Sequence, residues 1–204
     1  MVFPHLSALE VFAVASLFLL LVPGPAVLYI VAQSAEQGRS AGLASVAGVH
    51  VGTIVHIVAA TVGLSALVVA SATAFTVIKL AGAVYLIYVG VRKLLERETP
   101  LRVQRRTRAR LFAQGVVVNV LNPKTALFFL AFLPQFVDPD RGAVWSQVVT
   151  LGLVFVALGL VSDSLYALAS DAVGALLRRR ATAMRRISGT IYVGLGAVAA
   201  FAHR

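Results

Sequence analysis

The chain alternates long stretches of uncharged, mostly apolar residues with short clusters of basic residues. The longest uncharged stretch holds 39 residues between Arg39 and Lys79, and a further 12 separate Lys79 from Arg92. A helix rises ~1.5 Å per residue, so about 20 residues cross a hydrocarbon layer of ~30 Å. The region between Arg39 and Arg92 is therefore too long for one membrane span and fits two, with the connecting turn predicted at residues 71–74.

The same pattern predicts six membrane-spanning helices. They cover residues 6–35, 41–70, 75–91, 111–137, 144–169 and 187–202. Composition agrees with an all-α integral membrane protein, since 59% of the residues are hydrophobic and the mean hydropathy is +0.91. The first apolar run lacks a preceding Lys or Arg and a cleavage site, so it is interpreted as a retained helix and not as a signal peptide. The absence of cysteine excludes disulfides, thiolate metal sites and thiol catalysis.

Basic residues orient these helices, because Lys and Arg in short loops stay on the cytoplasmic side. Fourteen of them lie in the three loops that would share one side, against two, Arg141 and Arg204, on the other. The fourteen are Arg39, eight residues between positions 92 and 110, and five between positions 178 and 186. Both termini are therefore expected outside, with six spans between them. The net charge of +10 is interpreted as this topology signal and as contact with anionic lipid, and not as nucleic-acid binding, since no reading module accompanies the arginines.

Two halves of three helices suggest an internal repeat. The segments KLAGAVY at 79–85 and RISGTIY at 186–192 share a pattern at an offset of 107, and Pro25 corresponds to Pro123 at an offset of 98. Because each half has an odd number of spans, the halves are inverted relative to each other. The predicted units are a first three-helix repeat at 1–95, a basic cytoplasmic loop at 96–110 and a second three-helix repeat at 111–204.

Prolines interrupt the first and fourth predicted helices at corresponding places in the two halves. Proline removes a helical hydrogen bond and disfavours helical geometry in the preceding residue, so Pro23-Gly24-Pro25 and Asn122-Pro123-Lys124 leave backbone groups unpaired. In a membrane such breaks are tolerated only beside protein or a watery cavity. Lys124 lies at the middle of the uncharged stretch 111–137, where an ammonium group costs about 2.5–3.5 kcal/mol, so it is expected to face the interior. Paired breaks of this kind point to a transport site near the bilayer midplane.

Four further ionisable side chains inside the predicted spans are relevant to the site: Asp163, Lys79, His50 and His56. Asp163 is the predicted counter-charge for Lys124 or for Lys79, although Lys79 lies near a helix end and its side chain can extend to the surface. His50 and His56 are candidates for a proton relay or for metal binding. They are six residues apart and point to different sides of the helix, so packed neutral histidines bonded to backbone or hydroxyl groups are favoured.

The second predicted helix also carries a stripe of small residues. Ala44, Gly48 and Gly52 recur every four residues, which permits close contact with another helix. Weaker candidates for cavity-lining polar groups are Gln33, Thr53, Asn119 and Gln135.

Four segments are informative together: PGPAVLYIVAQSAEQGRSAGLASVAGVHVG, KLAGAVYLIYVGVRKLL, NVLNPKTALFFLAFLPQFVDP and SDSLYALAS. In order and spacing they resemble the lysine exporter (LysE-type) translocator family, in particular its homoserine/threonine-exporter branch. The resemblance implies a small inner-membrane exporter of amino acids or related metabolites that runs on the proton gradient. It marks as site residues Pro23, Gly24, Pro25, Asn122, Pro123, Lys124 and Asp163. The chain departs from the family pattern at Ala26-Val27, where an asparagine is usual.

The residue pattern and the family resemblance both predict a secondary transporter for a small amino-acid-like substrate. In this hypothesis Lys124 and the N–H groups of the half-helix that begins at Ala26 bind the substrate carboxylate, while Asp163 holds its ammonium group or exchanges a proton. The phosphate-binding loop of ATPases is absent from the sequence, so no ATP site and no cofactor are expected. Two alternatives stay open: a divalent-metal exporter, and an intramembrane enzyme that would use Asp163 with His50 or His56. A homodimer and a monomer also stay open.

Overall fold

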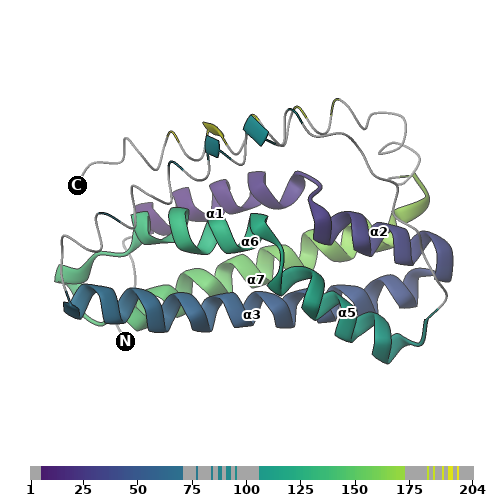
Figure 1. The fold of residues 1–204 in the computed structure, drawn as a ribbon, viewed down its shortest axis with the longest axis horizontal. Coiled ribbons are helices and arrows are strands. Elements are labelled where there is room, and N and C mark those ends of the chain that lie inside the picture. The colour runs from purple at the N-terminus through teal and green to yellow at the C-terminus, as the bar shows by residue number, and fades with distance from the viewer. Residues whose placement is uncertain are drawn as a thin grey trace.

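The computed structural model in Figure 1 describes residues 6–70 and 106–172, together with isolated positions elsewhere. The described residues form helices joined by short turns and contain no strand, which confirms the all-helical architecture. Apart from the isolated positions, the predicted helices at 75–91 and 187–202, with Lys79 and the paired segments 79–85 and 186–192, lie outside the described residues. The six-helix inverted repeat therefore stays a prediction.

Four of the predicted spans fall within the described residues, and all four are helical. The first is broken into α1 (Leu6–Leu21) and α2 (Pro25–Gln37), and the second is the continuous helix α3 (Arg39–Ala70). The fourth is broken into α5 (Arg108–Val120) and α6 (Pro123–Leu127), and it continues through a π-helical turn, η1 (Phe128–Phe132), and a 3₁₀ turn, η2 (Leu133–Phe136). After the short turn η3 (Pro139–Arg141) comes the fifth span, α7 (Val144–Leu168). Every observed boundary lies close to its prediction.

The two broken spans bend at their prolines, as the sequence predicts. The bend is 51° between α1 and α2 and 45° between α5 and the α6–η2 segment. By length and apolar composition, α3 and α7 each suffice to cross a membrane, and each bent pair passes the same test as one unit. Exposed side chains such as Val14, Val58 and Leu165 give the bundle an apolar outer surface, which suits contact with lipid.

The broken spans run in opposite directions along the two long helices (Figure 1). As a result, the end of α2 and the start of α5 lie at one end of the bundle, whereas α1 and η2 meet toward the other. The Tyr29 hydroxyl donates a hydrogen bond to the Leu111 carbonyl over 2.7 Å, and the Ser34 hydroxyl donates to the Ala167 carbonyl over 2.6 Å. These bonds tie α2 to α5 and to α7.

Exposed arginines gather at this same end of the bundle, which we call the basic end. They are Arg39, Arg106, Arg108 and Arg110. The backbone N–H of Arg106 donates to Gln37 Oε1 over 2.8 Å, which joins the start of the second described stretch to the end of α2. The first predicted loop and the end of the central basic loop therefore lie on one side, as the charge pattern predicts.

The turn between α2 and α3 requires a glycine. Gly38 has a φ of +88°, in the left-handed region that side chains rarely adopt. Its N–H donates to the Ser34 carbonyl over 2.9 Å and closes the end of α2. This single residue reverses the chain and places α3 beside α2.

The small-residue stripe of α3 packs directly on α5, as predicted from its spacing. A Cβ atom built on Gly48 would lie 2.0 Å from the Phe112 carbonyl oxygen, and one on Gly115 would lie 2.7 Å from the Ser45 carbonyl oxygen. Backbone meets backbone here, so neither helix can yield locally to a side chain. Glycine lets the two helices approach this closely, and the contact joins the first half of the chain to the second.

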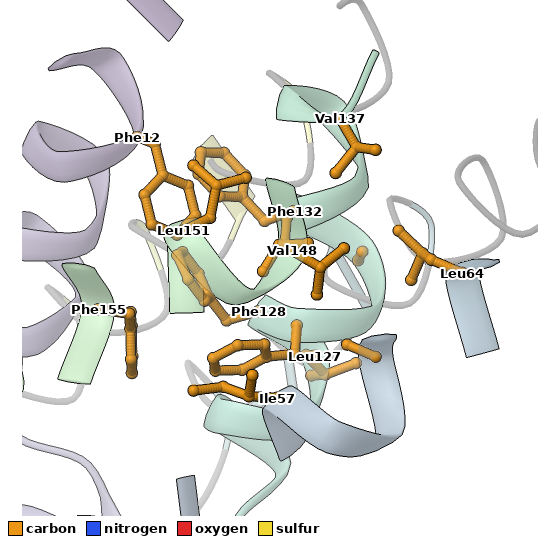
Figure 2. Packing of buried hydrophobic residues seen from close by; sticks show 14 of the residues in the cluster. Phe12, Ile57, Leu64, Leu127, Phe128, Phe132, Val137, Val148, Leu151 and Phe155 are labelled. Atoms are coloured by element: carbon orange, nitrogen blue, oxygen red, sulfur yellow. The ribbon is translucent and has the colours of Figure 1, made fainter. Parts of the chain in front are cut away.

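An aromatic cluster fills the core beyond the breaks, on the side away from the basic end (Figure 2). Phe128 lies at its centre, with its ring centroid 4.7 Å from that of Phe155 on α7 and 5.5 Å from that of Phe12 on α1. Phe128, Phe129 and Phe132 are all almost fully buried within the π-helical turn. Because these rings touch three different spans, the cluster fixes the segment after the second break against α1 and α7.

Candidate functional site

The first break leaves carbonyl groups that side chains from other spans satisfy. Pro25 has no N–H, so the Leu21 carbonyl four residues earlier loses its helical donor. The Tyr166 hydroxyl of α7 donates to that carbonyl over 2.6 Å. The Val22 carbonyl, in the gap between α1 and α2, accepts a hydrogen bond of 2.5 Å from Lys124 Nζ.

The second break is satisfied in a similar way. Pro123 cannot donate to the Asn119 carbonyl, and His56 Nε2 of α3 lies 2.9 Å from that oxygen. A carbonyl only accepts, so the contact places a proton on Nε2. The Asn122 side chain caps α6 by accepting from the Lys124 N–H over 3.0 Å. His56 is thus a packed histidine bonded to backbone, as favoured from the sequence.

Lys124 faces the interior, as its central position in the span predicts. Only 6% of the residue is exposed, and its side chain passes over the backbone of Gly24 to reach the first break. A Cβ on Gly24 would lie 2.9 Å from Lys124 Cδ and 3.6 Å from Nζ. The two breaks therefore face each other, and one lysine side chain spans the distance between them.

Replacing Gly24 by alanine is expected to lower transport by about 10-fold with little loss of folded protein. The new methyl group displaces a flexible lysine chain and not a backbone, so the fold tolerates it while the ammonium group moves; small misplacements at a binding site cost up to ~100-fold. Rates of substrate efflux and thermal unfolding, measured on one preparation, check this. A rate within twofold of the parent protein would show that the position of Nζ is unimportant.

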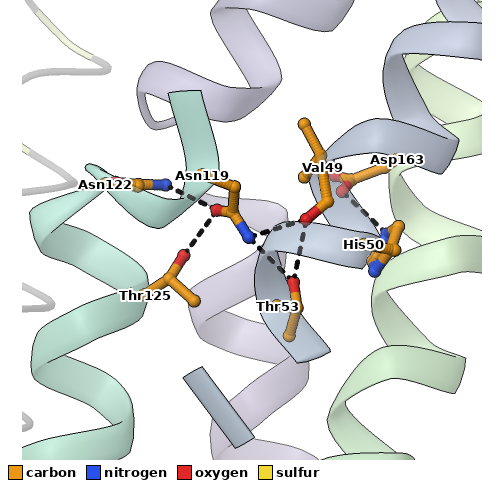
Figure 3. A network of polar contacts seen from close by, with 7 residues as sticks. All are labelled: Val49, His50, Thr53, Asn119, Asn122, Thr125 and Asp163. Atoms are coloured by element: carbon orange, nitrogen blue, oxygen red, sulfur yellow. Dashed lines mark hydrogen bonds and ion pairs between the residues drawn. The ribbon is translucent and has the colours of Figure 1, made fainter. Parts of the chain in front are cut away.

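Asn119 is the centre of a buried polar network beside the second break (Figure 3). Its Nδ2 donates to the Val49 carbonyl and to Thr53 Oγ1, each over 2.8 Å. Its Oδ1 accepts from Thr125 Oγ1 over 2.9 Å and from Asn122 Nδ2 over 3.2 Å. All four capacities of the amide are used, so Asn119 locks α5 and α6 to α3. From the sequence alone, Asn119 is only a weak candidate.

His50 and Asp163 form a buried ionisable pair between α3 and α7 (Figure 3). His50 Nε2 lies 3.2 Å from Asp163 Oδ2, and the two residues are 5% and 3% exposed. The contact lacks hydrogen-bond alignment, and among the described residues both ring nitrogens and Asp163 Oδ1 have no hydrogen-bond partner. Gly159 makes room for the ring, since a Cβ there would lie 2.6 Å from His50 Cε1. The pair retains unused donor and acceptor capacity in an apolar interior.

This pairing corrects two expectations. Within the described part of the chain, the ion partner of Asp163 is His50 and not Lys124, while Lys79, the other predicted partner, lies outside the described residues. Lys124 instead donates to the Val22 carbonyl, although it is close enough to Asp163 for their charges to attract. His50 contacts a carboxylate and not the backbone or hydroxyl group expected for it.

A narrow cavity of about 30 Å³ lies where these groups meet. Its polar lining consists of His50, Thr53, Asn119, Asn122, Lys124, Thr125 and Asp163. Its remaining lining consists of Leu19, Leu20, Gly24, Ala26, Val27, Val49 and Phe155. All of these residues are buried, and we call this conformation, with its narrow cavity, the closed conformation.

The structure brings together some of the predicted site residues and separates others. Gly24, Asn122, Lys124 and Asp163 line the cavity, and so does His50. The lining does not include Pro23, Pro25, Pro123 or His56. Pro25 and Pro123 shape the site by removing backbone hydrogen bonds and not by lining the cavity. In the described residues, no three His, Asp or Glu side chains gather closely enough to hold a metal ion.

Tyr166 and Phe155 touch these features but were not among the residues predicted from the sequence. Tyr166, which caps the first break, lies three residues after Asp163, or about one helical turn, and that spacing was the available signal. Phe155 lies two turns before Asp163 on the same helix and contributes the aromatic part of the cavity wall.

The profile of the LysE type translocator family matches residues 17–203, which is nearly the entire chain. The chain belongs to this family. Family membership makes it a membrane translocator and not an enzyme, in agreement with the resemblance drawn from the four segments. No solved structure shows significant similarity to the chain.

Three similar proteins match the chain over most of its length. A homoserine/homoserine lactone efflux protein of Salmonella typhimurium is 30% identical, over 94% of this chain and 95% of its own. An uncharacterized membrane protein of Vibrio cholerae is 32% identical, over 89% of this chain and 91% of its own. A second uncharacterized membrane protein, from Pseudomonas aeruginosa, is 30% identical over 88% of each chain. These matches support an exporter of small amino-acid-like molecules.

Proposed function

We propose that this translocator exports small amino acids, such as homoserine or its lactone, from the cytoplasm across the inner membrane in exchange for protons. The observation that carries the proposal is the meeting of a buried ammonium group, a free helix N-terminus and a buried carboxylate–imidazole pair around one cavity. These are the groups that a zwitterion and a proton require.

The carboxylate of the substrate is expected at the junction of the two breaks. Among the described residues no side chain caps the start of α2, where Ala26 and Val27 line the cavity. The N–H groups of its first turn and its positive dipole end are therefore available. Lys124 adds a full positive charge beside them. On binding, the carboxylate would replace the Val22 carbonyl as the partner of Nζ, exchanging a neutral acceptor for a charged one.

The ammonium group is expected at Asp163, and this arrangement supplies the coupling. Asp163 with His50 can hold either a proton or the substrate ammonium group, but the two positive charges compete for one buried carboxylate. An amino acid that binds from the cytoplasm would expel the proton, and a proton that binds from outside would expel the amino acid. Exclusive occupation of one site by two ligands is sufficient for antiport. A lactone, which has no carboxylate, would use this half of the site alone.

The apolar side of the cavity favours short, uncharged side chains. Leu19, Leu20 and Phe155 occupy that wall and offer no polar partner to a charged side chain. Because the cavity holds about 30 Å³, it must enlarge when substrate enters. We propose that the six predicted spans form two inverted halves that move against each other, with the basic end in the cytoplasm, both termini outside and anionic lipid around the arginines.

The deciding experiment is efflux from proteoliposomes loaded with radiolabelled compounds under an imposed pH gradient. We expect efflux of homoserine, threonine or homoserine lactone to exceed that of lysine and glutamate by at least about 10-fold. Liposomes without protein give the background rate. Dissipating the pH gradient should remove the gradient-driven part of the efflux. Efflux of divalent metal ions with none of any amino acid would overturn the proposal.

Replacing Asp163 by asparagine is expected to reduce gradient-driven efflux by at least about 10-fold. Asparagine keeps the size of the side chain but holds neither a proton nor a full negative charge, so the link between the two fluxes is lost. Exchange of labelled for unlabelled substrate at equal pH is measured at saturating substrate, because the ammonium group also loses its charged partner. It should be less affected than net efflux, since it requires no proton step. Equal loss in both assays would show that Asp163 does not couple the two fluxes.

A further inference from the structure

Each break is held by a side chain from the long helix of the other half. The carbonyl that Pro25 deprives of its donor, on Leu21, is bonded by Tyr166 of α7. The carbonyl that Pro123 deprives of its donor, on Asn119, is bonded by His56 of α3. A helix of the second half thus closes the break in the first half, and a helix of the first half closes the break in the second half.

The two donors occupy corresponding positions. His56 and Tyr166 are separated by 110 residues, and so are Thr53 and Asp163, which lie three residues before them and line the cavity. On each long helix, one residue therefore faces the cavity, and the residue one turn later bonds the break in the other half. This correspondence is independent of the cavity chemistry, because neither Tyr166 nor His56 lines the cavity.

We propose that Tyr166 and His56 are positioning residues that stabilise the closed conformation through which transport must pass. The inference rests on the proposed transport function. When one half moves against the other to open the cavity, a break and its donor separate, because they belong to different halves. A proline-freed carbonyl in a membrane has little water to replace that donor, so the two bonds favour the state in which both breaks are closed.

The bond from Tyr166 should matter more than the bond from His56. Among the described residues, the Leu21 carbonyl has Tyr166 as its donor, whereas the Asn119 carbonyl also accepts from the Asn122 N–H over 3.0 Å. Removal of the Tyr166 hydroxyl leaves the Leu21 carbonyl without this donor, whereas removal of His56 leaves the Asn119 carbonyl with the Asn122 N–H as a donor. The two effects therefore have a predicted order as well as a direction.

The test uses a single thiol in the cavity, which is possible because the chain has no cysteine. Val27 lines the cavity and is 4% exposed, so V27C should react with N-ethylmaleimide only when the cavity opens. In this background we expect Tyr166→Phe to speed labelling about 10-fold and His56→Leu about threefold. His56→Gln, which retains a donor, should label within twofold of V27C alone.

Tyr29→Phe is the matched control. It also removes a phenolic hydroxyl bonded to a backbone carbonyl between helices, but that carbonyl, on Leu111, lies inside α5 where the N–H four residues later can serve it. We expect its labelling rate to stay within twofold of the V27C protein. If Tyr29→Phe accelerates labelling as much as Tyr166→Phe does, the proline-freed carbonyl has no special role. The inference also fails if Tyr166→Phe and His56→Leu both label at the rate of the V27C protein.

Transport kinetics on the variants without the added thiol give the second readout. Destabilising a closed intermediate should lower the maximal rate of homoserine efflux about 10-fold in Tyr166→Phe and leave the half-saturating concentration within twofold, because the cavity lining is unchanged. A rise in the half-saturating concentration at a constant maximal rate would overturn the inference. If the parent protein moves no amino acid, the proposed function fails, while the labelling rates still decide whether these residues hold the closed state.

Discussion

Replacing Lys124 by methionine is expected to lower amino-acid export at least about 100-fold and to leave the protein folded. Removing the partner of a buried charge costs about 3–5 kcal/mol, and each ~1.4 kcal/mol is tenfold in binding. The Val22 carbonyl loses its donor at a cost of about 1–3 kcal/mol, but loss of a buried ammonium group relieves about 2.5–3.5 kcal/mol. These contributions to stability nearly cancel, so the defect should be confined to transport. Efflux rate and thermal unfolding in detergent measure the two effects.

The control for this substitution removes positive charge from the basic end. Arg108 and Arg110 are exposed, and replacing both by glutamine should keep transport within about twofold, since exposed charges add only ~1 kcal/mol each to lipid attraction. Near-normal export by Lys124→Met would show that the buried ammonium group does not bind the substrate carboxylate. A collapse of both variants would indicate a general dependence on charge.

Replacing Gly48 by alanine is expected to cause the largest loss of stability among single methyl additions. The new Cβ would lie 2.0 Å from the Phe112 carbonyl oxygen, so α3 and α5 must separate. Overpacking in a tight core typically costs 1–3 kcal/mol, and here about 3 kcal/mol or more is expected because the obstacle is backbone. The yield of monodisperse protein and the unfolding temperature should both fall sharply.

Gly63, on the same helix, provides the matched control. Among the described residues nothing lies within 4 Å of a Cβ placed there, and alanine favours a helix over glycine by up to ~1 kcal/mol. Gly63→Ala should therefore be neutral or stabilising. Equal unfolding temperatures for the two alanine variants would contradict the close α3–α5 contact.

Much of the helical framework could be predicted because its causes are local. Uncharged length predicts the spans, and proline chemistry predicts the breaks at Pro25 and Pro123. The interior position of Lys124 follows from the energy of a charge in hydrocarbon. The stripe that includes Gly48 predicts a close contact, though not that its partner is α5, because spacing on one helix says nothing about the neighbour.

The side-chain pairings of the site could not be predicted, since they depend on how one helix is rotated against another. A charge count pairs Asp163 with the available lysines, but the packing of α7 on α3 puts His50 beside it, over Gly159. Asn119 carries little signal in a sequence where asparagine is tolerated in many helical positions. Its role arises only when α3 comes close enough for Val49 and Thr53 to accept its hydrogen bonds.

The glycine contact between α3 and α5 also constrains how the protein is made. A nascent chain completes α3 before it reaches α5, and at ~5–20 residues per second the intervening stretch 71–107 takes on the order of seconds to synthesise. Until then Thr53 lacks the Asn119 amide as a donor, and the glycine stripe lacks the helix that packs on it. Release of the first half into the bilayer before the second half arrives would expose this polar face to lipid. We therefore expect the insertion machinery to retain α3 until α5 emerges, so that the two halves assemble as one unit.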